Sequence, residues 1–415
     1  MGAVIETHCC IAGGGPAGMM LAFLLARMGV EVVVLEKHRD FLRDFRGDTI
    51  HPSTLQLMHE LGLLDEFLRC PHQEISELAG QVGAEKVTIA DFTHLPTFCR
   101  FLVLMPQWDF LDFMKAHAQR YPEFRLLMQA EVTDVIEENG SIAGVRANTP
   151  DGPLEVRAML TVGADGRHSM VRQRAGLKVI DLGAPMDVLW MRLSRRPGDP
   201  GQTFGHFDQG RILILLNRDE YWQVAFVIPK GAAGRVREKG LDAFRSELVA
   251  LEPFLRDRVD ELRDWKDVSV LTVTVDRLEK WSRPGLLCIG DAAHAMSPIG
   301  GVGINLAIQD AVATANLLGR ILLSRAPSDS KLQALQKRRS FPTRATQRVQ
   351  IEIQNRIIRN VLANTGPLTP PWPLELLARW PWLRRWPARA VGLGFRPEHV
   401  ETPEVAPAQQ RAGFG

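Results

Sequence analysis

The sequence lacks the patterns that mark metal sites, disulfide-stabilised folds and membrane-spanning proteins. Its histidines show no spacing such as H-x-x-x-H, which predicts that the protein binds no metal. No uninterrupted apolar run is long enough to cross a bilayer. The cysteines form no C-x-x-C pair, so reduced thiols in a cytosolic protein are a better interpretation than disulfides or metal ligands. They are Cys9, Cys10, Cys70, Cys99 and Cys288.

An excess of charge of either sign is also missing. The formal net charge is +2 over 415 residues, so bulk electrostatics gives no reason to expect a nucleic-acid partner. The apolar stretch near the N-terminus lacks the basic segment of a signal peptide and is interrupted by glycines. We therefore expect a cytoplasmic protein with no integral membrane span, large enough for two or three domains.

What the chain does contain is a glycine-rich turn in a characteristic setting. Residues 4–11 form an apolar run that predicts a buried strand, and G-G-G-P-A-G follows directly at residues 13–18. A helical stretch then covers residues 19–27, and a second apolar strand over residues 30–35 ends at Glu36. This order of strand, glycine turn, helix and strand with a terminal acid favours dinucleotide binding over a glycine turn in an ordinary α/β unit.

Each glycine of this turn would have its own physical role. Gly13 would allow the tight turn, Gly15 would let a pyrophosphate approach the backbone, and Gly18 would let the helix pack closely on the strand. The helix N-terminus would face the phosphates. Glu36 can accept hydrogen bonds from a ribose, and its carboxylate would disfavour a 2′-phosphate there.

Two further motifs follow much later in the chain. G-A-D-G-R stands at residues 163–167, and G-D-A-A-H stands at residues 290–294, with P-I-G-G-V-G at residues 298–303. Taken singly, Asp165 and Asp291 would be turn residues that cap helices. Three motifs in a fixed order instead predict that distant segments converge on one large, phosphate-containing cofactor.

The pattern of strands and helices divides the chain into regions of an α/β fold. Short strands between residues 180 and 280, with one helical stretch among them, indicate an antiparallel sheet inserted into the nucleotide-binding part. A helix over residues 328–359 is expected to break or kink near Pro342. We expect a first nucleotide-binding part at 1–179 with a short excursion to the sheet near 75–105, the sheet at 180–280, a second nucleotide-binding part at 281–340, a C-terminal helical region at 341–400 and a disordered tail at 401–415.

The C-terminal region is rich in tryptophan and arginine. Trp380, Trp382 and Trp386 stand among arginines between residues 374 and 395. Such a segment could be an amphipathic surface element for a membrane, a lipophilic substrate or a partner chain. We favour a helical cap that packs on the domain and keeps its arginines in solvent. Peripheral contact with a membrane stays open.

The three motifs, in this order, resemble the fingerprints of the class A flavoprotein monooxygenases, the FAD-dependent aromatic hydroxylases similar to para-hydroxybenzoate hydroxylase. The resemblance covers roughly residues 3–340. It implies a Rossmann-like FAD-binding domain with an inserted antiparallel β-sheet substrate domain and C-terminal helices. It also implies a monooxygenase that uses NAD(P)H and dioxygen to hydroxylate an aromatic or lipophilic, polyketide- or quinolone-like substrate through a flavin C4a-hydroperoxide. NADH or NADPH would bind transiently, because no second dinucleotide fold is visible.

The resemblance further implies contacts to FAD. An arginine near the nicotinamide route would be Arg46, with Arg43 as a rival, and Gln107 stands where many relatives carry arginine. Asp165 would lie near the pyrophosphate, and Asp291 would bind the ribitol. The ADP half would be held by Gly13, Gly15, Pro16, Ala17, Gly18, Glu36 and Lys37. The isoalloxazine ring would lie along Pro298, Gly301, Gly303 and Ile304, with Asn305 just beyond.

The glycine-rich loop at residues 298–303 also has a physical interpretation of its own. A glycine-rich loop lets backbone N–H groups approach a flat ring, and the helix that starts near Ile304 aims its positive end at that ring. Reduced flavin carries negative charge around N1 and the C2 carbonyl, so these donors would favour reduction by a nicotinamide. His294, beside this loop, is more simply explained as a structural residue than as a catalytic one.

The substrate would sit between the flavin and the inner face of the sheet. His206 and Tyr221 are the candidates for a catalytic base, and Pro298 is expected to belong to the catalytic centre beside the ring. The aromatic candidates for the pocket, Trp190, Phe204 and Phe226, could equally form the core of the sheet. The residues expected to line the substrate pocket are Trp190, Phe204, Gln223 and Phe226.

Three alternatives use the same cofactor. A flavin-dependent halogenase is disfavoured because its Trp-x-Trp-x-Ile-Pro motif is missing: Val224 and Phe226 precede Ile228-Pro229. A reductase of prenyl-type lipophilic substrates would show no incorporation of oxygen. A non-catalytic flavin-binding protein would show no substrate-stimulated use of NAD(P)H. The sequence leaves the last two open, and it predicts a monomer or a homodimer without distinguishing them.

Overall fold

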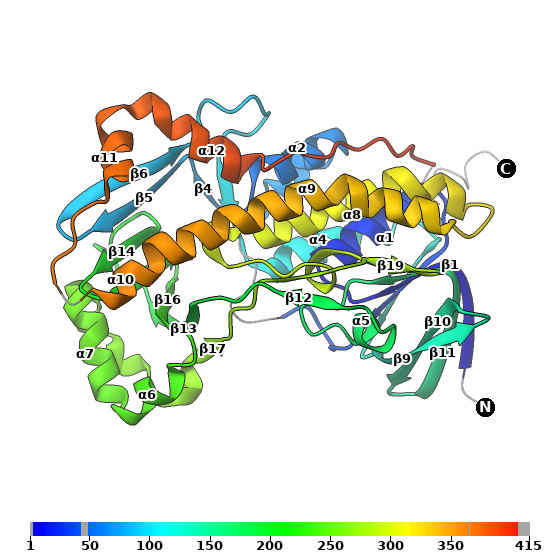
Figure 1. Cartoon of the computed structure of the whole chain (residues 1–415), viewed down its shortest axis with the longest axis horizontal. Coiled ribbons are helices and arrows are strands. Elements are labelled where there is room, and N and C mark those ends of the chain that lie inside the picture. The colour runs from blue at the N-terminus through cyan, green and yellow to red at the C-terminus, as the bar shows by residue number, and fades with distance from the viewer. Residues whose placement is uncertain (1–2, 43–48, 365, 406–415) are drawn as a thin grey trace.

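The computed structural model describes residues 3–42, 49–364 and 366–405 (Figure 1). Two large sheets organise the chain. The first has eight strands, and its central strands are parallel: β1 pairs with β2 on one side and with β11 on the other. In spatial order its main path is β19 (Ser282–Arg283), β20 (Leu286–Cys288), β11 (Gly152–Gly163), β1 (Ala3–Ala12), β2 (Val32–Glu36) and β8 (Phe124–Met128). The antiparallel strands β9 (Glu131–Glu138) and β10 (Ser141–Thr149) join at β11.

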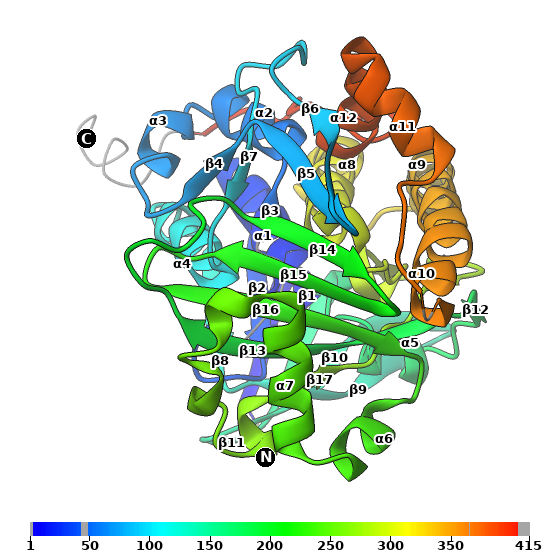
Figure 2. The same cartoon turned by 90° about the vertical axis from the view of Figure 1, so that its left-hand side faces the viewer.

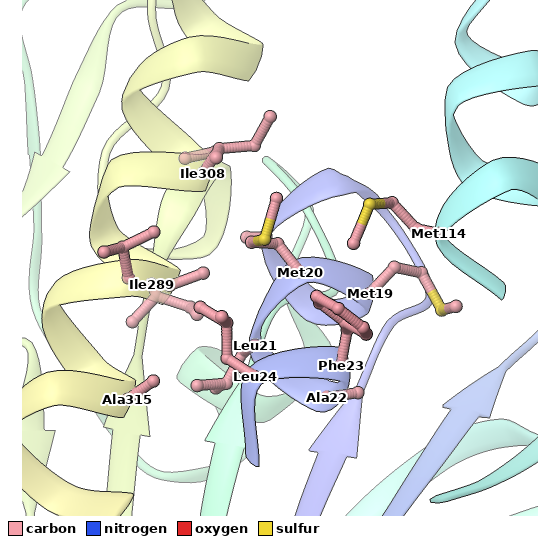
Figure 3. Packing of buried hydrophobic residues seen from close by; sticks show 14 of the residues in the cluster. Met19, Met20, Leu21, Ala22, Phe23, Leu24, Met114, Ile289, Ile308 and Ala315 are labelled. Atoms are coloured by element: carbon pink, nitrogen blue, oxygen red, sulfur yellow. The ribbon is translucent and has the colours of Figure 1, made fainter. Parts of the chain in front are cut away.

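Both faces of this sheet are covered, which is why β1 is apolar and buried over residues 9–12 and β2 over residues 32–35. Side chains alternate along β1: Cys9 and Ile11 belong to the cluster with the helices, whereas Cys10 and Ala12 belong to the cluster with β9 and β10. The helical layer consists of α1 (Pro16–Arg27), α4 (Gln107–Ala118) and α8 (Val302–Leu322). Figure 3 shows α1 packed between Met114 of α4 and Ile308 of α8.

The second sheet has seven strands and is antiparallel except where β14 meets β5. In order these are β17 (Ser269–Leu271), β13 (Met186–Ser194), β16 (Tyr221–Pro229), β15 (Arg211–Asn217), β14 (Phe204–Asp208), β5 (Glu77–Val82) and β6 (Glu85–Asp91). Helix α7 (Leu241–Leu251) lies on one face of this sheet (Figure 2). Strands β5 and β6 come from a much earlier part of the chain than their neighbours. The expected α/β fold with an antiparallel sheet is confirmed.

Smaller elements complete the fold. The helices are α2 (Pro52–Glu60), α3 (Leu64–Phe67), α5 (Met170–Arg174) and α6 (Ala233–Glu238). The strands are β3 (Thr49–Ile50), β4 (Gln73–Ile75), β7 (Leu102–Leu104), β12 (Val179–Asp181) and β18 (Asp276–Leu278). Strands β3, β7 and β4 form a small antiparallel sheet, and β12 pairs with β18.

A long helix, α9 (Asp329–Ile353), lies beside α8 and continues toward the second sheet (Figure 1). The helix does not break at Pro342, because it is continuous through this buried residue. A kink there stays a prediction. The irregularity lies later, where a π-helical turn at Gln354–Ile358 leads into α10 (Arg359–Ala363). Such turns widen a helix locally and are frequent at functional sites.

The C-terminal region folds back over the molecule. Helices α11 (Trp372–Arg379) and α12 (Arg385–Gly392) pack against β6, beside which they lie in both views (Figures 1 and 2). The disorder expected from residue 401 is wrong for residues 401–405. The backbone N–H of Val405 donates to the carbonyl of Arg27 at 2.8 Å, and the guanidinium of Arg27 pairs with Glu404 at 3.1 Å. The rest of that tail, 406–415, lies outside the described residues.

No helix within the described ranges has both the length and the apolar character that crossing a membrane requires.

Candidate active site

A cavity of about 1640 Å³ lies between the carboxyl ends of β1, β2 and β11 and one face of the seven-stranded sheet. Pockets for a single drug-sized ligand measure roughly 300–1,000 Å³, so this cavity has room for a large cofactor and a second molecule. One end is lined by residues of all three glycine-containing motifs, and the other by apolar side chains of the sheet and of α9 and α10.

The first glycine turn closes over the end of β1. Gly13 has φ +105°, and a Cβ there would lie 2.4 Å from the carbonyl oxygen of Ala164. A Cβ on Gly18 would lie 2.0 Å from the carbonyl oxygen of Gly13, and this residue packs beneath the turn without lining the cavity. By contrast, a Cβ on Gly15 would meet nothing within 4 Å. Gly13 and Gly18 are therefore needed for packing, whereas Gly15 keeps space open.

That open space has the chemistry of a phosphate site. Gly15 is the N-cap of α1 and offers no side chain to cap the helix, so the first N–H groups of the helix stay available. Pro16 and Ala17 line the cavity beside it. A helix N-terminus with free N–H groups and no side chain in front of it fits a pyrophosphate.

Glu36 joins the tip of β2 to the glycine turn. Its side chain is buried, and its two carboxylate oxygens accept hydrogen bonds from the backbone N–H of Gly14 at 2.9 Å and of His38 at 3.1 Å. Each carboxylate oxygen can accept a second bond. Glu36, Lys37 and His38 all line the cavity, so the carboxylate is placed for a ribose. That contact remains a prediction.

The second and third motifs meet at the same end. Asp165 lines the cavity, and its Oδ2 accepts from the backbone N–H of Val171 in α5 at 3.1 Å. Burial raises the pKa of the Asp165 carboxyl above its ordinary value, although the hydrogen bonds it accepts act in the opposite direction. Asp291 is more accessible, and its Oδ2 lies 3.6 Å from a guanidinium nitrogen of Arg167. This ion pair links the two motifs across the cavity wall.

Steric fit also holds the motifs together. Gly290 has φ +58°, and a Cβ there would lie 3.1 Å from Ala307 of α8 and 3.2 Å from Ala17 of α1. The turn that carries Asp291 is therefore wedged between the two helices whose N-termini reach the cavity.

The loop before α8 forms the middle of the wall. Gly300 and Gly301 have φ +76° and +61°, and a Cβ on Gly301 would lie 2.8 Å from the hydroxyl of Thr49. Pro298, Gly303 and Ile304 line the cavity next to them. The start of α8 is thus presented to whatever lies against the loop, as expected for a site that stabilises negative charge.

Asn305 differs from its expected role. It is buried behind the loop, where its Oδ1 accepts from the N–H of His51 and from the hydroxyl of Thr54, each at 2.8 Å. Its Nδ2 donates to the carbonyl of Thr49 at 2.9 Å. Asn305 does not line the cavity, so we correct its assignment from a cofactor contact to an anchor that fixes the loop against α2.

His294 is also structural. Its Nε2 lies 2.6 Å from Oδ2 of Asp310, which also accepts from the N–H of Gly290 at 3.1 Å. Arg339 of α9 donates to the other oxygen of Asp310 at 2.9 Å. Burial alone would raise the pKa of Asp310, but His294 and Arg339 hold it below its ordinary value. The group supports the Asp291 turn from behind.

Three glutamines of α9 and the π-helical turn hold the loop before α8 and the segment that leads into it, and sequence reasoning missed them. Gln347 donates to the carbonyls of Asp276 and Ala295 at 2.7 and 3.2 Å. Gln350 donates to the carbonyls at 297 and 299, each at 2.9 Å, and accepts from the N–H of Ser297. Gln354 donates to the Ser297 hydroxyl at 2.7 Å. Their spacing of three and four residues places them on one helix face, which was the available signal.

The far end of the cavity is apolar. Alternate residues of three neighbouring strands point into it, and α9 and α10 close it from the other side. The strand residues are Met186, Val188, Trp190, Ile212, Ile214, Leu216, Ala225 and Val227. The helical residues include Ile353, Arg356, Ile357, Asn360 and Val361. Of the four residues expected to line the substrate pocket, the structure brings Trp190 and Phe204 to the cavity.

Phe226 lies on the opposite face of the sheet, so its assignment to the pocket is wrong. Its ring packs edge-to-face on Phe244 of α7, with centroids 5.4 Å apart. Side chains alternate along a strand, and its neighbours Ala225 and Val227 face the cavity instead. Gln223 also does not line the cavity; it accepts a hydrogen bond from Nε of Arg218 at 3.1 Å.

The two candidates for a catalytic base are also corrected, for different reasons: His206 pairs with a residue next to α7, whereas Tyr221 shares the strand face of Ala225 and Val227 but lies at the start of β16, away from the cavity. His206 is buried and lies 2.8 Å through Nδ1 from Oε1 of Glu252, directly after α7. The ring of Tyr221 stacks against the guanidinium of Arg192, 3.8 Å from the ring centroid. Neither residue lines the cavity.

The predicted cofactor contacts outside the glycine-containing motifs differ in whether the structure describes them. Gln107 lines the cavity at the start of α4. Arg167 and His168, which were not among the predicted site residues, also line it. Arg43 and Arg46 lie outside the described residues, so their predicted contact with FAD stays a prediction.

Comparison with known proteins now identifies this arrangement. A family model described as "FAD binding domain" matches residues 6–349. The chain belongs to this FAD-binding family. It is 34% identical over 358 residues to the 6-methylpretetramide 4-monooxygenase of Streptomyces rimosus, covering 85% of this chain and 84% of that relative. Other relatives are longer: the chain is 28% identical to the rifampicin monooxygenase of Rhodococcus hoagii over 72% of its own length and 61% of that protein.

Solved structures support the fold. PqsL of Pseudomonas aeruginosa in complex with 2-aminobenzoylacetate superposes with a TM-score of 0.72 at 22% identity, over 86% of this chain and 98% of that one. The p-nitrophenol 4-monooxygenase PnpA of Pseudomonas putida superposes with a TM-score of 0.74 at 18% identity, over 95% of this chain and 100% of that one. The expected resemblance to class A flavoprotein hydroxylases is confirmed, and the protein is an FAD-dependent monooxygenase.

Proposed function

We propose that this monooxygenase hydroxylates a polycyclic aromatic polyketide, which binds in the apolar end of the cavity. The observation that carries the proposal is the division of one 1640 Å³ cavity into a motif-lined end and an apolar end. A relative that shares most of the chain is named for action on 6-methylpretetramide. A planar, lipophilic molecule of several fused rings suits a wall of branched aliphatic side chains and Trp190.

The motif-lined end fits FAD. The open space before Gly15, the acceptor Glu36, the accessible carboxylate of Asp291 and the loop at 298–303 would hold the pyrophosphate, ribose, ribitol and ring system respectively. Bound FAD, reduced by NADH or NADPH, would supply the activation of dioxygen and the transfer of one oxygen atom. The positive end of α8 would stabilise negative charge on the ring.

The chain's own part would be orientation and exclusion of water rather than proton removal at the substrate. Among the described residues, the apolar end named above contributes no carboxylate or imidazole to the cavity wall. A substrate that is already electron-rich or ionised in solution therefore suits the site better than one that needs a protein base. His206 and Tyr221 cannot fill that role from their positions.

The remaining assignments are part of the same proposal. NAD(P)H would bind transiently, dioxygen would be the second substrate, and a cytoplasmic monomer or homodimer would act without a nucleic-acid partner. A prenyl reductase and a non-catalytic flavin-binding protein would use the same cofactor, but the relatives' names favour neither.

The test is the visible spectrum of the purified protein, followed by NADH and NADPH oxidation in air with tetracyclic aromatics and with simple phenols. We expect a yellow protein whose NAD(P)H consumption rises with a tetracyclic aromatic, whose product carries one added oxygen from ¹⁸O₂. Stimulation by monocyclic phenols alone would exclude the proposed substrate class. Substrate reduction without incorporated oxygen would point to the reductase, and no stimulation at all to the binding protein.

A further inference from the structure

The C-terminal helices α11 and α12 present two different faces. On the inner face, Ala388 is fully buried in a cluster with Phe92 and Leu95, and a Cβ on Gly392 would lie 2.7 Å from Leu95. The carbonyl of Val391 lies 2.7 Å from Nδ1 of His51. Leu374 and other inner residues line the cavity. The segment is therefore a fixed part of the domain.

The outer face carries four exposed tryptophans. The exposed fractions of Trp372, Trp380, Trp382 and Trp386 are 70%, 44%, 58% and 69%. The chain has nine tryptophans, and the other five are all buried or half-buried. Exposed tryptophans are therefore confined to residues 372–386. Single apolar residues on a surface need no explanation, but a cluster of large ones marks an interaction site.

Arginines share that outer face. Arg379, Arg385 and Arg389 are exposed, and the guanidinium of Arg379 lies 5.5 Å from the ring centroid of Trp380. Trp382, Trp386 and Arg389 follow one another at spacings of four and three residues, which places them on one side of the helical run. Residues 371–392 hold four arginines and one glutamate, a net charge of +3, whereas the whole chain has +2.

We propose that this outer face, defined as the Trp/Arg face of residues 372–389, docks the protein on the surface of a membrane that contains anionic lipids. Tryptophan prefers the interface between headgroups and hydrocarbon, where its ring is buried and its N–H stays wet. Arginine stems cover apolar surface while the guanidinium reaches phosphate. Interfacial helices combine these two residue types, and they bind in proportion to apolar area and attraction to anionic lipid.

A second copy of this chain fits the face less well. A two-fold dimer would bring the same surface of each subunit together, so a charge of +3 would face another +3 across the contact. Like charges brought together disfavour such an interface. An anionic lipid surface offers the opposite charge. The inner side of the same segment lines the cavity, so docking would also bring the apolar end of the cavity close to the bilayer.

The experiment uses the full flavin-loaded protein with two kinds of vesicle, phosphatidylcholine alone and phosphatidylcholine mixed with phosphatidylglycerol. We expect sedimentation with the mixed vesicles only, accompanied by a blue shift of tryptophan emission. Replacing Arg385 and Arg389 together by Gln should weaken binding about twenty-five-fold, because each cation near an anionic surface contributes about a factor of five. The double change Trp382→Ser with Trp386→Ser should weaken it at least as strongly.

Matched controls come from elsewhere on the surface. Arg235→Gln with Arg237→Gln, on the exposed side of α6, removes the same charge, and Phe98→Ser with Leu323→Ser removes exposed apolar side chains. Flavin content and melting temperature establish that each variant is folded.

Absence of binding to the mixed vesicles would overturn the proposal, as would equal losses in the control variants. Self-association in solution that the tryptophan changes abolish would assign the face to a second copy instead. Because vesicle binding is measured without turnover, its outcome is independent of the proposed hydroxylation.

Discussion

At the end of the cavity that carries the motifs, glycines and the starts of α1 and α8 form much of the wall, whereas at the other end branched side chains of β13, β15 and β16 form it. The first end depends on where backbone atoms can approach one another: Cβ atoms at Gly13 and Gly18 would collide with the carbonyls of Ala164 and Gly13. The second depends on which face of a strand each residue occupies. Backbone geometry therefore shapes the cofactor end, whereas the choice of side chains shapes the substrate end.

The largest expected effect comes from substitutions at two neighbouring residues of β16, which lie on opposite faces of the seven-stranded sheet. Phe226→Ala should destabilise the protein by about 3–5 kcal/mol, since it removes a buried ring from the core with α7. Val227→Trp, one residue along, should instead fill the cavity and raise the KM for a tetracyclic aromatic at least ten-fold at unchanged flavin content. Chemical unfolding and steady-state kinetics measure the two effects.

The opposite result would exchange the roles of Phe226 in the core and Val227 in the cavity wall. Altered substrate selectivity in Phe226→Ala with little loss of stability would mean that Phe226, rather than Val227, faces the cavity.

Two substitutions in the glycine turn should separate its role in packing from its role in FAD binding. Gly13→Ala should destabilise the fold by about 2–4 kcal/mol, because the new Cβ meets a carbonyl and the positive φ is strained. Gly15→Ala should leave the stability of the flavin-free protein unchanged, since its Cβ meets nothing, but should weaken FAD binding at least ten-fold. Melting curves without FAD and fluorescence titration with FAD read the two effects separately.

Equal FAD affinity in Gly15→Ala and the unchanged protein would show that the pyrophosphate lies elsewhere. Equal stability in Gly13→Ala would contradict the close approach of the first two motifs.

A smaller effect is expected at Asp291. Asp291→Ala should weaken FAD binding by about 1.5–3 kcal/mol, or roughly ten- to a hundred-fold, because a charge-assisted hydrogen bond is lost. Arg167→Gln breaks the 3.6 Å ion pair with the same carboxylate and serves as the control for an effect of that pair alone. Full flavin retention in a folded Asp291→Ala protein would remove Asp291 from the site.

The motif-lined end could be anticipated from the sequence because its constraints are local. Gly13, Gly15 and Gly18 stand within six residues, and the turn itself fixes what each must do. The placement of Asp165 and Asp291 followed from the order of the motifs and from a family resemblance. Asn305 was misplaced because the start of a helix points some side chains at the loop and others behind it, which spacing alone does not resolve.

The apolar end could not be anticipated to the same degree. An error of one residue in the phase of a strand exchanges its two faces, and on β16 that error put Phe226 in the cavity in place of Val227. Nearly every residue of this strand is apolar and buried, so no alternation between polar and apolar residues marked the inner face. His206 was likewise misassigned, because its partner Glu252 comes from a distant segment.

The smallest predicted effect concerns the glutamines that hold the loop before α8, in the middle of the cavity wall. Gln350 makes three hydrogen bonds to the backbone of the loop at 297–299, so Gln350→Leu should cost about 1–3 kcal/mol of loop stability by leaving buried groups unpaired. We expect a lower turnover number and faster loss of FAD, with the core intact. Gln336→Leu, nearer the start of the same helix and bonded to Trp281 and Glu279, is the matched control. If both variants lose FAD equally, α9 supports the whole domain rather than the loop; if only Gln350→Leu does, one helix sets the loop against which cofactor and substrate meet.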